Sequence, residues 1–419
     1  MASIPGGVPV LGFMSPNDDL DTYAVIDPIY GIDGLRSVAD NTERDAITAQ
    51  RRREGMLVYT QDSNTYWQLA ADLTTWSPFS GGSGYSDTNG FANLTDSIVT
   101  VNVGTRTLTV TPVGLSFDVY SNGTLYTHST PQSVIWTDVE GEHYFYFDTT
   151  GTLVETTVFD PDIIKKWAIT SVIYWNVPGQ LIEFRAEERH GLSMDGATHA
   201  YLHQTFGAVW RSGLTLSGIT VDGNGSLDAH ATVTTDAGVI ADEDLTFSMG
   251  PSAVYPVYYQ IAAGVWRRVL AQNFPVLTTG TGRIACNDGY AQVEVTNNKF
   301  VLAHIFATNE VATPIIAVQG LLEYETINAA RQGALSEITA ITGLPTPEFV
   351  ALGTLIYQTN DGYTNTVKGR IRSTDDGGTY VDWRQHLALK PSSTFGYEAI
   401  AELQGNTVVH EAAWGGFAG

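Results

Sequence analysis

Short runs of alternating apolar and polar residues, separated by turns that contain glycine or asparagine, constrain this chain most. Such runs occupy 97–101, 107–111, 115–120 and 143–147, and the turns include Ser121-Asn122-Gly123. Side chains alternate between the two faces of a β-strand, and asparagine and glycine supply the positive backbone angles of tight hairpins. The pattern predicts a mainly β protein, with β-sandwich-like modules and a few short helices in a multi-domain α+β arrangement.

Composition agrees with this class and excludes others. Among 419 residues there are 42 glycines and 20 tyrosines but only 16% charged residues, which favours strands and turns over long surface helices. The net charge of -24 argues against nucleic-acid binding, which depends on lysine and arginine. No apolar run is long enough to span a bilayer, so no membrane insertion is predicted. The single cysteine, Cys286, excludes an intrachain disulfide.

Two segments have helical rather than β-type spacing. Residues 198–206 form a short candidate helix. Residues 327–341 follow a capping threonine, Thr326, and carry an apolar stripe that includes Leu335 and Ile338. A glycine and a proline then end the pattern, so the sequence predicts a helix at 327–341.

The segment near the N-terminus reads as a small helix followed by a hairpin. Asp40 and Glu43 fit a helix N-cap with its reciprocal acid, and the following turn would carry Ala46 and Ile47 inward. Two β-type runs with a turn-rich loop then occupy 56–69. About fifty residues bury only part of their surface, so we expect this module to lean on other parts of the chain or on other copies.

Composition shifts divide the chain into six parts. They are an N-terminal arm (1–22), a helix-plus-hairpin docking module (23–78), a Gly/Ser-rich linker (79–90), a β-sandwich-like domain (91–187), a β-rich domain with the two short helices (188–390) and a C-terminal tail (391–419). Three consecutive arginines in the module, Arg51, Arg52 and Arg53, are the candidate docking residues because they make a basic corner in an acidic chain.

The best metal candidates are three histidines and one aspartate, His190, Asp195, His199 and His203. His199 and His203 lie one helical turn apart, and His190 and Asp195 lie nearby in the sequence. Imidazoles at positions i and i+4 of a helix can chelate one ion. A zinc hydrolase would need a glutamate directly after the first histidine, and Ala200 stands there. We therefore predict structural, hydrogen-bonding histidines and no cofactor, with a structural divalent cation as the alternative.

A second candidate cation site is an acidic loop. Side-chain oxygens recur at alternate positions, which suits calcium, and Asp236, Asp242, Glu243 and Asp244 add acidity nearby. The alternative is a hairpin turn rich in asparagine, aspartate and glycine. The candidate ligands are Asp222, Asn224, Ser226 and Asp228.

Catalytic motifs are missing from the sequence. It contains no nucleophile elbow, phosphate loop or dinucleotide fingerprint in a strand-to-helix setting. Adjacent acids such as Glu187 and Glu188 carry little weight among 45 acidic residues, and Cys286 has no neighbouring base. We therefore predict that the chain is not an enzyme.

The chain also resembles virion proteins of tailed bacteriophages of the tail-fibre and head-fibre type. The resemblance rests on segments that cover most of residues 35–384. They are Val38-Ala39-Asp40, Arg44 to Ile47, Gly55 to Tyr59, Tyr66 to Leu69, Glu188 to Gly191, Thr198-His199, Tyr201 to His203, His304 to Asn309, Leu344-Pro345, Glu348-Phe349 and Tyr380 to Arg384.

The resemblance implies a virion structural protein, a tail fibre or fibre adaptor attached to the particle through its N-terminal region. It implies a homo-oligomer, most often a trimer, that contacts other phage structural proteins. The alternatives are a receptor-binding protein that recognises a host-surface glycan or receptor, and a head fibre or capsid decoration protein. A capsule depolymerase is less favoured because no regular β-helix periodicity is present.

Overall fold

The computed structural model describes residues 35–49, 52–79, 88–341, 343–346, 348–374 and 376–385. The predicted arm, the C-terminal tail, most of the predicted linker and Arg51 lie outside these residues. The chain divides into two compact units, Met1–Tyr85 and Ser86–Gly419. Strands dominate the described residues of both, which confirms the predicted mainly β class.

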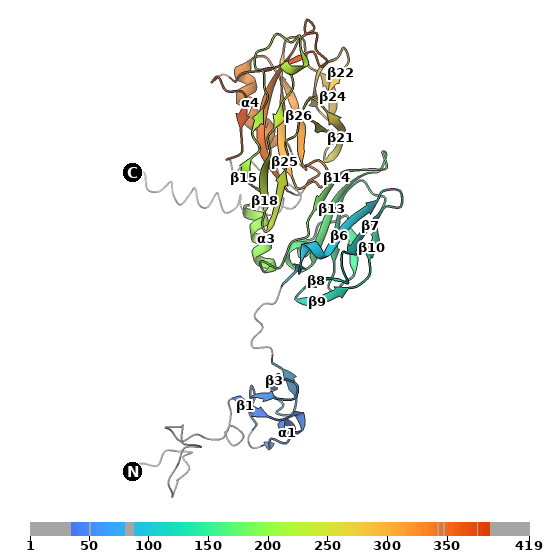
Figure 1. The fold of residues 1–419 in the computed structure, drawn as a ribbon, viewed down its shortest axis with the longest axis vertical. Helices are drawn as coiled ribbons and strands as arrows, with labels where there is room; N and C mark the ends of the chain where they lie inside the picture. Colours follow the sequence, from blue (N-terminus) through green and yellow to red (C-terminus); the bar gives the residue numbers. More distant parts are fainter. Residues whose placement is uncertain are drawn as a thin grey trace, which may run out of the picture. The chain divides into compact units, whose positions relative to one another are not determined.

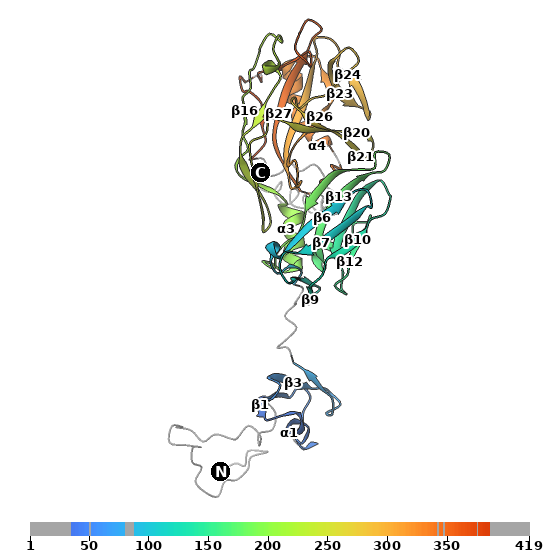
Figure 2. The same cartoon turned by 45° about the vertical axis from the view of Figure 1, so that its right-hand side comes forward.

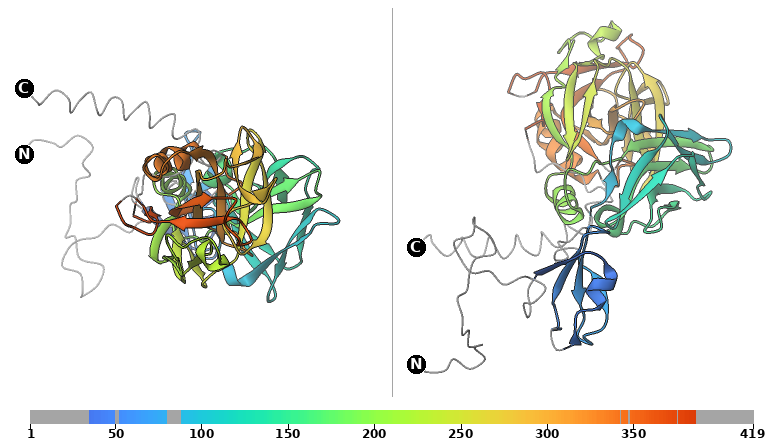
Figure 3. Two further views of the ribbon diagram at one scale, coloured as in Figure 1. Left: turned by 90° about the horizontal axis from the view of Figure 1, so that it is seen from above. Right: turned by 60° about the horizontal axis from the view of Figure 1, so that its bottom comes forward.

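The smaller unit is a four-stranded sheet with one short helix, α1 (Asn41–Asp45), shown in Figure 3. The strand order is β1 (Leu35–Val38), β2 (Leu57–Thr60), β3 (Thr65–Leu69) and β4 (Trp76–Pro78), with β1 parallel to β2. Asp40 caps α1 by accepting a hydrogen bond from the backbone N–H of Glu43, as predicted. The hairpin of β2 and β3 also confirms the prediction. The pairing of β1 and β4 with this hairpin was not anticipated.

The residue that α1 buries is Arg44, whereas the sequence predicted Ala46 and Ile47. Ala46 is exposed, so that prediction was wrong, whereas the half-buried Ile47 packs against the core of the small unit as predicted. The Arg44 guanidinium lies 4.4 Å from the ring centre of Trp67 and 5.5 Å from that of Trp76. A helix of five residues is too short to present an apolar stripe, and a long arginine side chain can cover aromatic rings instead.

The first part of the larger unit consists of three antiparallel sheets and their connections. Several phenylalanines and tryptophans of this part, including Phe145 and Trp175, pack together as one buried cluster. The orders are β5 (Gly90–Phe91), β8 (Phe117–Ser121), β9 (Thr124–His128); β10 (Gln132–Ile135), β7 (Thr107–Pro112), β6 (Ser97–Asn102); and β12 (Leu153–Thr156), β11 (Gly141–Phe147), β13 (Ala168–Asn176), β14 (Leu181–Glu187).

The second part is built on a seven-stranded sheet. Its order is β21 (Val265–Gln272), β20 (Tyr255–Ala262), β26 (Ile315–Tyr324), β25 (Phe300–Thr308), β27 (Phe349–Thr359) and β28 (Gly369–Arg372), and β29 (Val381–Asp382) also pairs with β27. Figures 1 and 2 show this sheet in one half of the larger unit and β6 to β14 in the other. Smaller sheets flank it: β15 (Val209–Gly213), β18 (Gly238–Asp242), β19 (Leu245–Met249); β16 (Leu216–Ser217), β17 (Thr234–Thr235); and β22 (Thr278–Thr279), β23 (Arg283–Asp288), β24 (Ala291–Glu294).

Helix α4 (Ile327–Ala340) packs on the seven-stranded sheet, with Thr326 as its N-cap. The helix and its cap were predicted, but its packing on this sheet was not. The predicted apolar stripe was wrong at one position, because Leu335 is 49% exposed while Glu337 is buried. The sheet-facing arc runs through Ala330, Ala334 and Ile338, and Leu335 lies outside it.

The two halves of the larger unit share one core. A buried cluster joins Tyr174 of β13 to Tyr258, Trp266 and Phe306 of the seven-stranded sheet. The predicted domain boundary at 187/188 therefore falls inside a single compact unit. Near that boundary lie two further helices, α2 (Asp162–Lys165) and α3 (Gly196–Thr205).

Candidate functional site

The three predicted histidines meet in the interior of the larger unit. The ring centres lie 4.4 Å apart for His190 and His199, 4.6 Å for His199 and His203, and 5.4 Å for His190 and His203. All three are buried. Five carboxylates surround them, and we call the whole group the histidine–carboxylate cluster. Its members are Glu188, His190, His199, His203, Asp242, Glu243, Asp244 and Glu348.

Helix α3 positions two of the histidines. It confirms the predicted helix at 198–206, and its spacing places His199 and His203 on one buried face. Asp195 caps the helix by accepting from the backbone N–H and the hydroxyl of Thr198. Asp195 is therefore a capping residue and not a fourth member of the cluster. A side chain at Gly196 would overlap the carbonyl of Lys165 in α2, so glycine allows the two helices to pack closely.

The turn between β18 and β19 supplies three of the acids. Asp242 ends β18, and Glu243 and Asp244 form the turn. Glu243 has a positive φ of 44°. A non-glycine residue in this left-handed region costs about 1–2 kcal/mol. The turn holds the Glu243 side chain inside the protein, where it is 1% exposed.

Hydrogen bonds fix the orientation of each imidazole. Nδ1 of His190 lies 2.7 Å from Oδ1 of Asp244, whose other oxygen accepts from the backbone N–H of Gly191. Nδ1 of His203 lies 2.8 Å from Oε1 of Glu348. The remaining ring nitrogens of these two histidines therefore face the centre of the cluster.

The inward-facing nitrogens lie close to one another and to Glu243. Nε2 of His203 is 2.9 Å from Nε2 of His199 and 3.4 Å from Oε2 of Glu243. Nε2 of His190 is 4.0 Å from the same Glu243 oxygen. Four ligand atoms, one from each residue, lie within 4.8 Å of one another. The arrangement can hold one cation between three nitrogens and one carboxylate.

Burial and mutual repulsion raise the pKa values of three of the cluster's acids, Glu188, Asp242 and Glu243. Burial raises the pKa of Asp242 well above its ordinary value, and the charges of Glu348 and Glu243 add to the effect. Burial, followed by Glu348, raises the pKa of Glu243 to about 7. The pKa of Glu188 is raised as well, mainly by burial. Taking several carboxylates out of water together is costly unless a cation compensates them.

The histidines respond to the same surroundings in opposite directions. Burial lowers the pKa of His190, but the hydrogen bond to Asp244 and the Glu188 carboxylate, 3.7 Å from Nε2, outweigh it, so the pKa lies well above its ordinary value. Burial and the neighbouring imidazoles hold the pKa of His199 well below its ordinary value.

The sequence did not lead us to assign the acids of this cluster to the histidine site. Asp242, Glu243 and Asp244 were assigned to the neighbourhood of the candidate calcium loop, and Glu188 was discounted as one of a chance pair. One local signal in the sequence could have placed these acids in the interior. It is the alternating pattern of β18, which is followed directly by the acidic turn. Glu348 lies 145 residues from His203, so no spacing in the sequence relates them.

The four candidate calcium ligands have protein partners in the structure. Asp222 pairs with Arg372 and accepts from Ser373, while Asp228 accepts from the backbone and hydroxyl of Thr366. The remaining two contact each other, because Asn224 accepts from the backbone and hydroxyl of Ser226. The contacts of Asp222 and Asp228 fasten the loop to the region of β28.

The two described arginines of the candidate docking corner differ in their surroundings. The guanidinium of Arg52 donates to the backbone carbonyls of Asp45, Ile47 and Leu73. Its hydrogen bonds therefore connect segments within the small unit. Arg53 is exposed and donates to the carbonyl of Arg52. Of these two, Arg53 is the one that presents its side chain to solvent.

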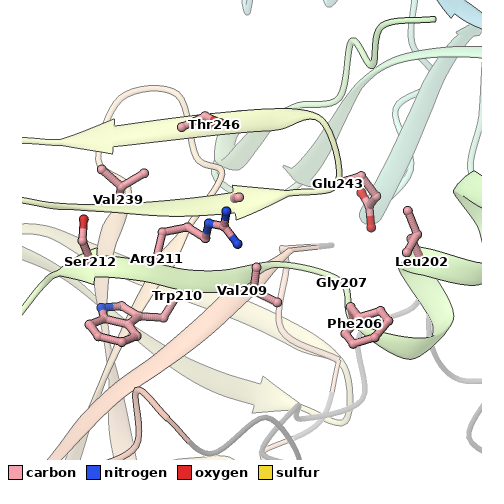
Figure 4. A pocket seen from close by; sticks show the side chains of 11 residues that line it. Leu202, Phe206, Gly207, Val209, Trp210, Arg211, Ser212, Val239, Glu243 and Thr246 are labelled. Carbon is pink, nitrogen blue, oxygen red and sulfur yellow. The ribbon is translucent and has the colours of Figure 1, made fainter. Parts of the chain in front are cut away.

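A cleft of about 740 Å³ lies beside the cluster, between the end of α3 and the strands β15 and β18. Figure 4 shows the Arg211 side chain extending from β15 toward β18. Glu243 and Leu202 lie at one end of the cleft, on the right of the view. Phe206 and Trp210 add aromatic surface to the lining. The size lies in the range of small-molecule binding sites.

Comparison of the chain with protein-family models, curated proteins and solved structures found no match. None of the helices in the described ranges is long and apolar enough to cross a membrane.

Proposed function

We propose that this chain is a non-enzymatic structural protein of a tailed-bacteriophage virion, a tail fibre or fibre adaptor held on the particle by its N-terminal region. The observation that carries the proposal is the small unit. The segment that resembles phage virion proteins folds as a compact sheet and helix within the separate unit Met1–Tyr85. Its exposed Arg53 would contact acidic surfaces of other phage structural proteins.

The test is incorporation into particles. A tagged chain lacking residues 1–79 is expected to be absent from gradient-purified virions while the remainder keeps its circular dichroism spectrum. Arg53→Glu is expected to reduce incorporation, and Lys165→Glu, an exposed charge reversal on the larger unit, serves as its control. Normal incorporation of the truncated chain would refute the proposed attachment, and absence of the full chain from virions would refute the virion role.

A homo-oligomer, with a trimer favoured, is part of the proposal. Several apolar side chains of the larger unit are exposed, and Leu115 is 94% exposed. Ile98 of β6 and Ile135 of β10 are exposed as well. Contact between copies would remove such surfaces from water. Sedimentation equilibrium of the full chain distinguishes a trimer from a monomer, and a monomer at micromolar concentration would refute this part.

Recognition of a host-surface glycan is the second candidate, because of the cleft beside α3. Arg211, Phe206 and Trp210 combine a cation with aromatic surface, a pairing suited to binding acidic sugars. Arg211→Ala is expected to weaken binding on a glycan array, whereas Tyr290→Ala, an exposed aromatic outside the cleft, is expected to leave it unchanged. Array silence and failure of the purified chain to block adsorption would exclude this candidate.

A further inference from the structure

The histidine–carboxylate cluster contains buried polar atoms that the protein itself does not satisfy. Six such atoms have no hydrogen-bond partner among the described residues: Oε2 of Glu188, Nε2 of His190, both oxygens of Asp242 and both oxygens of Glu243. The four side chains are between 0% and 3% exposed. Buried polar groups are normally paired, because an unpaired one costs free energy. Several such atoms directed at one place indicate a site that can hold a cation.

The outward-facing contacts of the histidines match those of metal-bound imidazoles. A metal-binding histidine generally donates its other ring N–H to a carboxylate or a carbonyl, which fixes the ring. His190 and His203 have such carboxylates in Asp244 and Glu348. His199 donates to the backbone carbonyl of Ile164.

The carboxylates are held in the same manner. Oε1 of Glu188 accepts from the side-chain amide of Asn309 at 2.7 Å, and Oε2 of Glu348 accepts from the backbone N–H of Ala208 at 2.6 Å. These bonds come from segments that are far apart in the sequence. The cluster is thus positioned by its surroundings before any ion enters, which lowers the cost of binding.

We propose that the chain binds one zinc ion through Nε2 of His190, His199 and His203 and a carboxylate oxygen of Glu243. Zinc–nitrogen bonds of 2.0–2.1 Å in a tetrahedron place ligand atoms about 3.3 Å apart. The corresponding distances are 2.9 Å between His199 and His203, 3.4 Å between His203 and Glu243, and 4.0 Å between His190 and Glu243. Shifts of less than about 1 Å would bring these pairs to the tetrahedral spacing.

The donor set selects a transition metal. Calcium and magnesium prefer oxygen ligands, whereas three imidazoles favour zinc and its neighbours. Asp242 and Glu188 carry further negative charge next to the ion and strengthen its binding.

Four protein ligands fill all four positions around a tetrahedral zinc ion and leave none open for a substrate. The site therefore has a structural role. The ion ties together the loop after β14, helix α3 and the turn between β18 and β19. This inference is independent of the proposed virion role.

The experiment measures zinc in the full-length chain. Purified protein is dialysed against metal-free buffer, and its zinc content is determined by plasma mass spectrometry. We expect about one zinc ion per chain, removal by a strong chelator with a lower melting temperature, and restoration of both by added zinc. Cobalt added to the chelated protein is expected to give the visible spectrum of a tetrahedral site.

Three variants separate this site from adventitious binding. His199→Ala and Glu243→Gln are expected to lose the zinc, and Asp244→Asn is expected to weaken its affinity about 10–100-fold by releasing His190. His230→Gln, a partly exposed histidine outside the cluster, is expected to retain it.

Two results would overturn the proposal. One is a wild-type chain that holds no zinc and whose melting temperature does not respond to zinc. The other is equal zinc content in all variants. If His199→Ala fails to fold, the cobalt spectrum of the wild-type protein decides the question, and its absence counts against the site.

Discussion

The buried carboxylate of Glu337 is expected to be among the most sensitive positions of the larger unit. It accepts hydrogen bonds from the backbone N–H groups of Leu321 and Leu322, at 2.9 and 3.2 Å, and from the hydroxyl of Tyr324, at 2.8 Å. Nε2 of His304 lies 3.2 Å from the same carboxylate. Because an ionised carboxylate only accepts, Nε2 of His304 carries the proton, and Nδ1 accepts from the hydroxyl of Thr354.

Glu337→Ala would leave these four donors without this acceptor, the His304 donor fully buried and the other three partly buried. Each unsatisfied donor costs about 1–3 kcal/mol, and water entering the vacated space offsets part of this, so we expect a loss of roughly 4–6 kcal/mol. A unit of roughly 300 ordered residues has an unfolding entropy near 0.6 kcal/mol/K, so the melting temperature should fall by about 6–10 °C. Differential scanning calorimetry and urea unfolding measure these changes.

Tyr324→Phe is the matched control for this prediction. It removes one of the four donors and keeps the ring, so we expect a loss of only about 1 kcal/mol. Glu337→Gln keeps one acceptor oxygen and is expected to fall between the two variants. A loss below about 1 kcal/mol for Glu337→Ala, or one equal to that of Tyr324→Phe, would refute the reasoning.

Three further predictions concern other parts of the larger unit. Gly196→Ala should lower the melting temperature measurably, because its Cβ would overlap the carbonyl of Lys165; unchanged calorimetry would contradict the packing of α3 on α2. Cys286 is 2% exposed and burial raises its pKa to about 11, so the native protein should react with a thiol reagent at pH 8 only after denaturant is added. Burial raises the pKa of Glu155, but bonds from His143 and Thr137 outweigh it and lower the pKa below 4.5. The stabilisation by Glu155 is therefore present well above pH 4.5 and lost as the pH falls through the lower folded value, so the stability gap between wild type and Glu155→Gln in urea unfolding should shrink on acidification.

Local patterns in the sequence sufficed for several elements and for the three histidines of the cluster. Alternation with glycine and asparagine turns predicted hairpins such as β2 and β3, and threonine and aspartate caps marked the starts of α1 and α4. The spacing of His199 and His203 predicted that they share a helix face. Each of these features depends only on residues a few positions apart, so the sequence is sufficient to predict it.

Tertiary structure alone decided which distant groups meet. Nothing local distinguishes Glu348 or Glu337 from the other acids of this chain, and each acquires its role from strands or helices elsewhere in the sequence. Arg44 likewise becomes buried only because β3 and β4 bring Trp67 and Trp76 beside it. The sequence alone thus determined the mainly β class, the helix caps and the histidine pair. The carboxylates that complete the cluster came from packing, because contacts between residues far apart in the chain depend on how whole sheets and helices are arranged.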